Sequence, residues 1–256
     1  MLVRAYQPPH AIFNPLELLN VVDCGDADAT PSVVEESFEE IELAAATILR
    51  AGAAPLALGG DGMISLPLLR AAKQQHPEIA VLHIDAHTDT YPGDGNAIHD
   101  RYNVATTFTR AAEEQLVDLE HSYHVGARGP VMMADVFEHT RDNGYNLIDG
   151  TELFAKGLSE TAERLKQHLG SRPVYLCFDM DFFDPSCAPG VCTPTWGGAS
   201  AREGLGFLQA LSGINCVAAD INTVSPPHDT GGMTAFLAST VALEILTLMC
   251  QARGLA

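Results

Sequence analysis

The feature that most constrains the fold is an alternation, along the whole chain, of short apolar runs with longer stretches of helical periodicity. This pattern is typical of repeated strand–helix units, in which helices cover both faces of a mainly parallel sheet. The predicted strands are Val21–Cys24, Leu56–Leu58, Ile79–Ile84, Tyr123–Val125, Tyr145–Ile148, Val174–Phe178 and Cys216–Ala219. The clearest predicted helices are Ser32–Ala51, Ile64–Gln75, Thr161–Leu169, Ala201–Leu211 and Met233–Met249.

The length and composition of the chain fit one domain. Its 256 residues, 46% of them hydrophobic, supply enough apolar side chains for one α/β core. No repeat or linker marks a boundary, so residues 1–256 are expected to form a single domain. Apolar runs such as Ile79–Ile84 are shorter than the roughly 20 residues that cross a bilayer, and the first residues lack the pattern of a secretory signal. We therefore expect a cytoplasmic protein without a membrane span.

The charge of the chain narrows the class of partner. Its 33 acidic and 14 basic side chains give a formal net charge of −19, which repels phosphate backbones and anionic lipids. Neither nucleic acid nor a membrane is expected as a partner. An acidic surface attracts metal ions and cationic ligands, although it also simply keeps a protein soluble. The six cysteines include no C-x-x-C pair and are interpreted as reduced thiols.

Acidic and imidazole side chains follow two of the predicted strands. Asp85, His87 and Asp89 stand at alternate positions after the first of them, so an extended backbone projects all three to one side. Asp179 and Asp181, again two apart, follow the second strand. Ligands of open α/β sheets bind outside the carboxyl ends of the strands, where these residues are expected to meet.

Such a concentration of carboxylates is costly unless cations neutralise it, because neighbouring like charges disfavour joint ionisation. Carboxylates that bridge two divalent ions would solve this problem, and an oxygen-rich ligand set with one nitrogen suits Mn²⁺. Either motif alone would be typical of a solvated loop or a helix N-cap. Both motifs together, with a Gly-Gly-Asp turn after a third strand, indicate a metal site.

The chain resembles the ureohydrolases, the arginase and agmatinase family, and agmatinases in particular. The matching segments, in the family order, are GGD (59–61), HIDAHTDTY (83–91), YHVGAR (123–128), DMDFFDP (179–185), PG (189–190), TP (193–194) and GG (197–198). The resemblance implies a three-layer αβα domain with a central, mainly parallel sheet. It also implies assembly as a homo-oligomer, usually a trimer or hexamer, and a small-molecule substrate.

The resemblance assigns roles to individual residues. It implies a binuclear manganese site in which Asp85 and Asp179 bridge the ions, His87 and Asp181 complete one shell, and Asp89 binds the other ion. A hydroxide held between the ions would attack the planar guanidinium or amidinium carbon, oriented by Asp89. His99 stands where agmatinases carry a proton-relaying histidine, and the alternative for it is a surface loop residue.

One departure from the family pattern affects the metal site. The family has a metal-ligating histidine after Gly-Gly-Asp, whereas this chain has Gly62. One ion is then left with carboxylates and water, so we expect one firmly bound Mn²⁺ ion and a second that is held loosely or is absent. His83 lies on the same side of its strand as Asp85 and is a conceivable substitute ligand, but it is expected deeper in the sheet.

Other departures affect the substrate pocket. Thr223 stands where the family has a glutamate that grips the substrate guanidinium by charge-assisted hydrogen bonds. Asp229, in the same loop, is a candidate for supplying part of that charge, with a solvated loop carboxylate as the alternative. Cys192 replaces a glycine of the family pattern.

The sequence therefore favours a metal-dependent hydrolase of C–N bonds in a guanidino, amidino or related amide compound. The alternative is a catalytically weak or inactive ureohydrolase-like subunit that binds a small molecule or supports an active paralogue. Gly62 and Thr223 are the features that favour this alternative.

Overall fold

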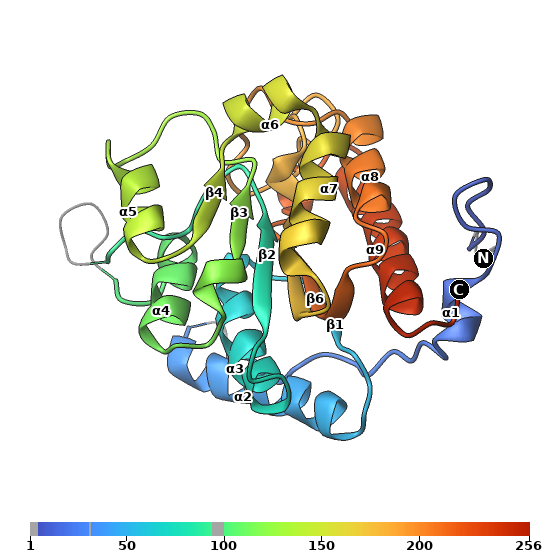
Figure 1. Cartoon of the computed structure of the whole chain (residues 1–256). Helices are drawn as coiled ribbons and strands as arrows, with labels where there is room; N and C mark the ends of the chain where they lie inside the picture. The colour runs from blue at the N-terminus through green and yellow to red at the C-terminus, as the bar shows by residue number, and fades with distance from the viewer. Residues whose placement is uncertain (1–4, 31, 94–99) are drawn as a thin grey trace.

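The computed structural model describes residues 5–30, 32–93 and 100–256 (Figure 1). Within these ranges six strands form one parallel sheet in the order β1-β6-β5-β2-β3-β4. The strands are β1 (Leu56–Leu58), β2 (Ala80–Ile84), β3 (Tyr123–Val125), β4 (Asn146–Ile148), β5 (Pro173–Asp179) and β6 (Asn215–Asn222). The longest strands are β5 and β6, and β5 lies between β6 and β2 in the middle of the sheet, where both faces are covered.

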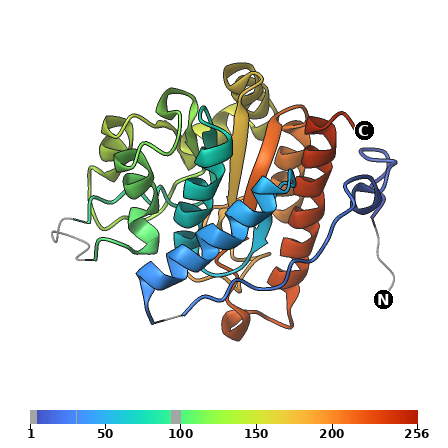
Figure 2. The same ribbon diagram turned by 90° about the horizontal axis from the view of Figure 1, so that it is seen from below.

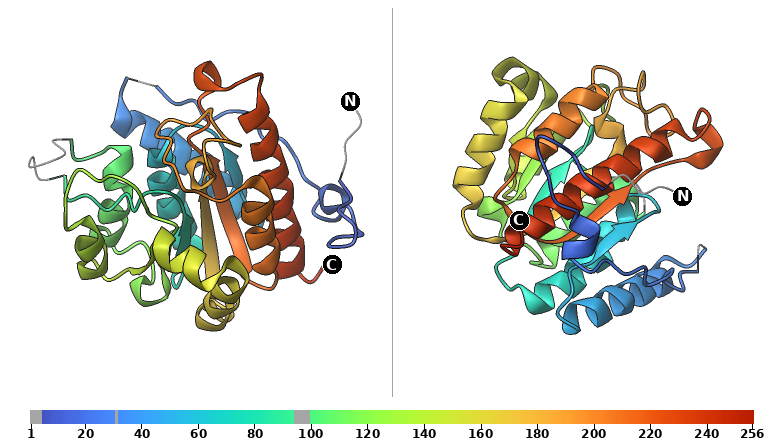
Figure 3. Two further views of the ribbon diagram at one scale, coloured as in Figure 1. Left: turned by 90° about the horizontal axis from the view of Figure 1, so that it is seen from above. Right: turned by 90° about the vertical axis from the view of Figure 1, so that its right-hand side faces the viewer.

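Helices form a layer on each face of the sheet (Figures 1 and 2). The α-helices are α1 (Pro15–Leu18), α2 (Val34–Arg50), α3 (Ser65–Gln75), α4 (Thr107–Glu113), α5 (Val136–Asp142), α6 (Gly150–Lys156), α7 (Leu158–Leu169), α8 (Ala201–Ala210) and α9 (Met233–Ala252). The 3₁₀ helices are η1 (Gly62–Ile64), η2 (Val104–Thr106), η3 (Leu119–His121), η4 (Met180–Phe182) and η5 (Pro226–His228). Short α1 lies against α9, as the right-hand view of Figure 3 shows.

The two layers arise from the alternation of side chains along the strands. On β2, Leu82 and Ile84 pack into a core cluster that contains residues of α7, α8 and α9. Val81, which precedes Leu82 and points to the opposite face, packs into a second cluster with residues of α2, α3 and α4. All three are fully buried, which explains why a central parallel strand has a continuous apolar sequence. The predicted three-layer α/β fold is confirmed.

Most predicted elements are present, with three kinds of difference. The predicted strand Val21–Cys24 is wrong: this segment is irregular, and Val21 and Val22 are exposed, because no strand lies beside them for backbone pairing. Helices α4, α5 and α6 were not predicted, since each has only seven residues and shows less than two full periods. The remaining predicted elements differ from the observed ones by a few residues at their ends.

One helix has the length and apolar composition of a membrane span. Among the described residues α9 alone meets both criteria, although the sequence analysis expected no such segment. Val241, Ile245 and Leu248 on this helix are buried in the core beside β6 and α8. Packing in the domain therefore accounts for its apolar sequence.

Candidate metal centre

The predicted acidic residues meet at the carboxyl ends of β2 and β5. These strands are adjacent and in parallel register, with Ile84 opposite Phe178, so Asp85 and Asp179 leave the sheet side by side. The backbone N–H of Ala86 donates to Oδ1 of Asp181 at 3.1 Å, which fixes the two following loops to each other. The fold thus converts two separate sequence motifs into one buried cluster.

The first group of potential ligands contains Asp85, His87 and Asp181. His87 Nδ1 lies 3.2 Å from Asp85 Oδ1 and 3.0 Å from Asp181 Oδ2. Both carboxylates are buried, whereas the side chain of His87 is 29% exposed. This group therefore has one side that solvent can reach.

The second group contains His83, Asp85 and Asp89, all of them buried. His83 Nε2 lies 2.8 Å from Asp85 Oδ2. Asp89 has a φ of 51°, in the left-handed region that is uncommon for residues other than glycine. This conformation turns its carboxylate back toward the end of β2, and such strain is typical of functional positions.

The donor spacing in these groups fits divalent ions. Adjacent ligands of an octahedral ion with bonds of about 2.1 Å lie about 3.0 Å apart. The two separations around His87 Nδ1, 3.0 and 3.2 Å, have this length. Because both groups contain Asp85, its two oxygens are placed to serve two neighbouring ions.

The electrostatics of the cluster also favour a cation. Burial raises the pKa values of Asp89, Asp179 and Asp181, and the carboxylate of Asp85 raises all three further. Burial opposes ionisation of Asp85 as well, but His83 and His87 outweigh it and hold the pKa of Asp85 far below its usual value. Burial works against protonated His87, yet its hydrogen bonds to Asp181 and Asp85 raise its pKa to about 11. Without an ion, the cluster therefore reduces its negative charge by holding protons. A bound divalent ion would neutralise the same charge.

Asp179 lies beside the two groups rather than within them. Its Oδ1 accepts a hydrogen bond from the backbone N–H of Asp181 at 2.7 Å and another from the hydroxyl of Thr223. Thr223 is 2% exposed and has a φ of 65°. The side chain at the predicted substrate-binding position therefore bonds to a predicted metal ligand. The bridging role of Asp179 stays a prediction.

Position 62 faces the cluster, as the resemblance requires for a lost ligand. A Cβ atom built on Gly62 would lie 3.3 Å from Asp89 Oδ2 and 2.9 Å from Cγ2 of Val104. Gly62 does not have a positive φ, unlike Gly59 and Gly60 before it. The backbone would thus accept a side chain at position 62 if Val104 moved.

Asp229 has other partners. Its two carboxylate oxygens accept backbone N–H groups of Thr234 at 3.0 Å and Ala235 at 3.1 Å, at the start of α9. These bonds stabilise the amino end of the helix, so the structure shows a capping role, and substrate binding by Asp229 stays a prediction. His99, the predicted proton relay, lies outside the described residues.

Sequence reasoning missed two polar contacts of the centre. The hydroxyl of Thr193 donates to Asp181 Oδ2 at 3.0 Å, and the ring of His124 lies 2.8 Å from that of His83, Nδ1 to Nδ1. Thr193 was part of the quoted Thr-Pro motif but had no assigned role. The pairing of His124 with His83 depends on β3 lying next to β2, a neighbour relationship that the local sequence does not encode.

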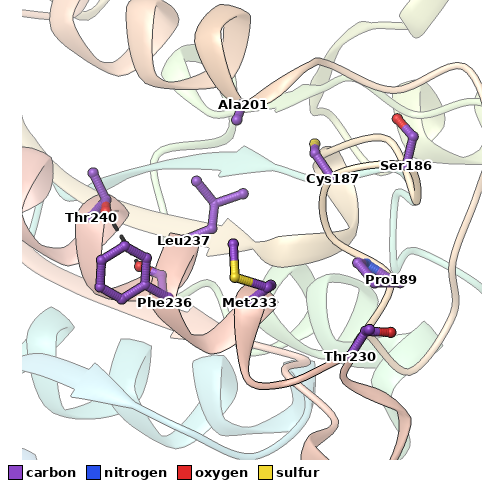
Figure 4. A pocket seen from close by; sticks show the side chains of 9 residues that line it. All are labelled: Ser186, Cys187, Pro189, Ala201, Thr230, Met233, Phe236, Leu237 and Thr240. Atoms are coloured by element: carbon purple, nitrogen blue, oxygen red, sulfur yellow. Dashed lines mark hydrogen bonds between the residues drawn. The ribbon is translucent and has the colours of Figure 1, made fainter.

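One cavity of the described residues lies apart from this centre. It has a volume of about 580 Å³ and lies between the starts of α8 and α9 and the 186–189 loop (Figure 4). Its lining is Ser186, Cys187, Pro189, Ala201, Thr230, Met233, Phe236, Leu237 and Thr240. It contains no carboxylate or imidazole, so the metal centre and not this cavity is the candidate for chemistry.

Comparison with known proteins agrees with this geometry. The arginase family model matches residues 2–248. An agmatinase of Escherichia coli O7:K1 is 36% identical over 242 residues, which cover 94% of this chain and 75% of the relative. A solved structure of a hypothetical agmatinase from Burkholderia thailandensis has a TM-score of 0.86 at 34% identity, covering 97% of this chain and 75% of that one.

A second solved structure widens the range of relatives. The proclavaminate amidino hydrolase of Streptomyces clavuligerus has a TM-score of 0.85 at 34% identity, covering 93% of this chain and 79% of that chain. The family match spans the whole described centre, from Gly62 to Thr223. The chain therefore belongs to the arginase family, the ureohydrolases.

Proposed function

We propose that the protein is a manganese-dependent hydrolase of C–N bonds in a guanidino, amidino or related amide compound. The observation that carries the proposal is the pair of ligand groups that share Asp85 at the end of β2. Similarity to an agmatinase and to an amidino hydrolase supports the substrate class. A shared carboxylate between two groups suits hydrolysis, for which paired divalent ions are a common device.

Residues of both loops would hold the ions. His87 and Asp181 would bind one ion, Asp89 the other, and Asp85 and Asp179 both. When bound, divalent ions lower the pKa of water enough to supply a nucleophile at neutral pH. Asp89 would orient the attacking water, since its carboxylate belongs to the second group and is held by a strained backbone. His99 would pass a proton to the leaving group.

The site would bind its natural substrate without a carboxylate at position 223 to hold a guanidinium group. The hydroxyl of Thr223 is directed at Asp179, and a hydroxyl carries no charge with which to hold a cation. Cys192 donates its backbone N–H to the carbonyl of Thr223 at 3.1 Å, which holds this segment against the 191–195 loop. We therefore propose that this site binds a guanidinium or amidinium cation less tightly than a carboxylate at position 223 would, and that a compound with a neutral reacting group, such as an amide, is a candidate substrate.

Turnover by the purified protein tests this proposal. After loading with Mn²⁺, it should release urea, ammonia or an amine from at least one compound in a panel of guanidines, amidines and amides. Chelation with EDTA should abolish the release, and added Mn²⁺ should restore it. A protein that binds Mn²⁺ but hydrolyses nothing in a broad panel would contradict the proposal.

A second candidate function is support of an active paralogue. The observation that favours it is the missing side chain at Gly62, beside Asp89. We propose self-association into trimers or hexamers for the active enzyme, whereas a supporting subunit would enter mixed oligomers. Light scattering of the protein alone, and again after co-expression with a ureohydrolase-like chain of the same genome, would separate the two functions.

A further inference from the structure

A line of buried hydrogen-bonding groups runs from the metal centre into the sheet. Asp85 Oδ2 lies 2.8 Å from His83 Nε2, and His83 Nδ1 lies 2.8 Å from His124 Nδ1. Asp85 and His83 are each 1% exposed, and His124 is fully buried. His83 and His124 are paired in register on β2 and β3, so the strands themselves set the spacing of the rings.

The partners determine which atoms carry hydrogen. Ionised Asp85 can only accept, so the nitrogen that faces it, His83 Nε2, is a donor. In a neutral ring, Nδ1 of His83 is then an acceptor, and the hydrogen between the two rings belongs to Nδ1 of His124. This arrangement leaves Nε2 of His124 as an acceptor without a partner among the described residues. An unpaired acceptor is more tolerable than an unpaired N–H.

The surroundings of His124 keep its ring in place. Its ring centroid lies 5.0 Å from that of Phe108 and 4.6 Å from that of Tyr145, both edge to face. Phe108 also contacts His83, with ring centroids 4.3 Å apart. Aromatic rings from α4 and from the residue before β4 thus enclose the pair, and neither imidazole has freedom to turn.

We propose that His83 and His124 are positioning residues for the metal centre. His83 would fix the orientation of the Asp85 carboxylate through Nε2–H, and His124 would fix the tautomer of His83. This inference rests on the proposed function, since it concerns the carboxylate shared by both ions. In this arrangement His83 Nε2 is engaged with Asp85, so His83 would orient a ligand and would not replace the one lost at Gly62.

The effect should reach both ions, because Asp85 belongs to both ligand groups. Removal of a partner that orients a metal ligand typically lowers metal affinity by about 10- to 100-fold. A ring without hydrogen-bonding atoms at position 83 should therefore weaken Mn²⁺ binding. A glutamine, whose side-chain amide retains an N–H donor, should restore most of it.

Mn²⁺ titration followed by the EPR signal of the free ion tests the proposal without requiring turnover. The variants are His83→Phe and His83→Gln, with His124→Leu and His124→Gln as a second pair. His76→Phe, in the connection between α3 and β2, serves as the matched loss of a histidine. Circular dichroism in EDTA checks that each variant folds. Pulsed EPR of bound Mn²⁺ reports nitrogen ligands directly.

We expect His83→Phe and His124→Leu to weaken Mn²⁺ binding by about 10- to 100-fold, and both glutamine variants and His76→Phe to stay within a few-fold of the unmodified protein. The nitrogen signal should be the same in His83→Gln and the unmodified protein. Unchanged affinity in His83→Phe, or loss of nitrogen signal in His83→Gln, would overturn the inference. If His83→Phe does not fold, the proposal is decided by the Mn²⁺ affinities of His124→Leu and His124→Gln and by the nitrogen signal of His83→Gln. Failure of the unmodified protein to bind Mn²⁺ would instead overturn the proposed function together with this inference.

Discussion

The hydroxyl of Thr223 donates a hydrogen bond to Oδ1 of Asp179, across the carboxyl ends of β6 and β5. The residue at this family position therefore contacts the metal centre itself. Its φ of 65° is disfavoured for a β-branched side chain, so threonine is a strained residue at this backbone position. An unbranched residue such as glutamate would fit the same backbone with less strain.

Thr223→Glu should raise kcat/KM for agmatine, which we expect to be a poor substrate of the unmodified protein. A restored carboxylate would grip the guanidinium by charge-assisted hydrogen bonds, with a gain of about 10- to 1,000-fold. Thr223→Gln, equal in size but uncharged, is the control and should give no such gain. Efficient agmatine hydrolysis by the unmodified protein would refute this interpretation of Thr223. Asp229 would then be the first candidate for the carboxylate that binds the guanidinium.

Gly62→His should increase the retention of a second ion. After extensive dialysis the unmodified protein should hold nearer one Mn²⁺ per chain than two, because Asp89 lacks a nitrogen partner at position 62. Val104 crowds the new Cβ, so Gly62→His combined with Val104→Ala should perform better than the single change. Metal analysis measures the stoichiometry, with Gly62→Ala as the control. Two non-exchanging ions in the unmodified protein would contradict the prediction.

Asp179→Asn should remove bound Mn²⁺ and activity together. The amide oxygen still accepts a hydrogen bond from the backbone of Asp181, so the fold should persist while the ligand charge is lost. Metal analysis and turnover on the same samples measure both effects. Asp149→Asn, which alters a helix-capping carboxylate of α6 while retaining an acceptor, should change neither. Normal Mn²⁺ content in Asp179→Asn would show that Asp179 is not a ligand.

His99→Asn should leave Mn²⁺ content unchanged and slow turnover. A proton relay contributes about 10²- to 10⁴-fold, so the loss of kcat should be large but incomplete. The ratio of kcat values at equal metal content is the measurement. Equal kcat values would mean that His99 is a surface residue.

Mn²⁺ binding should strengthen as the pH rises. The raised pKa of His87, about 11, keeps its imidazole protonated at neutral pH, and only the deprotonated ring binds a metal ion. Raised pKa values of Asp179 and Asp181 act in the same direction, since protons compete for the same oxygens. Calorimetry in two buffers of different ionisation enthalpy should show proton release on Mn²⁺ binding. Release of no protons at about pH 7 would contradict the assignment of His87 as a ligand.

The repeated strand–helix pattern was sufficient to predict the fold class, and the acidic motifs after β2 and β5 predicted where acidic side chains would gather. Asp85, His87 and Asp181 were predictable because strand alternation and a shared sheet edge bring them together. The prediction of a strand at Val21–Cys24 was wrong because two valines between polar residues do not form a strand without a neighbouring strand to pair with. The local sequence shows the periodicity of apolar residues, but it does not show which strands pair with each other.

Contacts between different strands account for what was missed at the site. Neither the order of the strands nor the left-handed backbone at Thr223 is visible in a periodic pattern, and both decide where side chains point. The pairing of His124 with His83 needs β3 beside β2, and the bond from Thr193 to Asp181 needs a folded loop. These residues become candidates only once the three-dimensional arrangement is known.

The hydrogen bond between Ala86 and Asp181 joins residues 95 positions apart in the sequence. During synthesis on the ribosome, the β2 loop emerges long before the β5 loop, and a domain acquires its packing only when its parts are available. A nascent chain that ends before Asp179 carries three of the five proposed ligands and lacks Asp181, which completes the group around His87. Under the proposed function, loading with metal would therefore follow translation, and the ions available to the chain at that moment would decide which metal the finished protein carries.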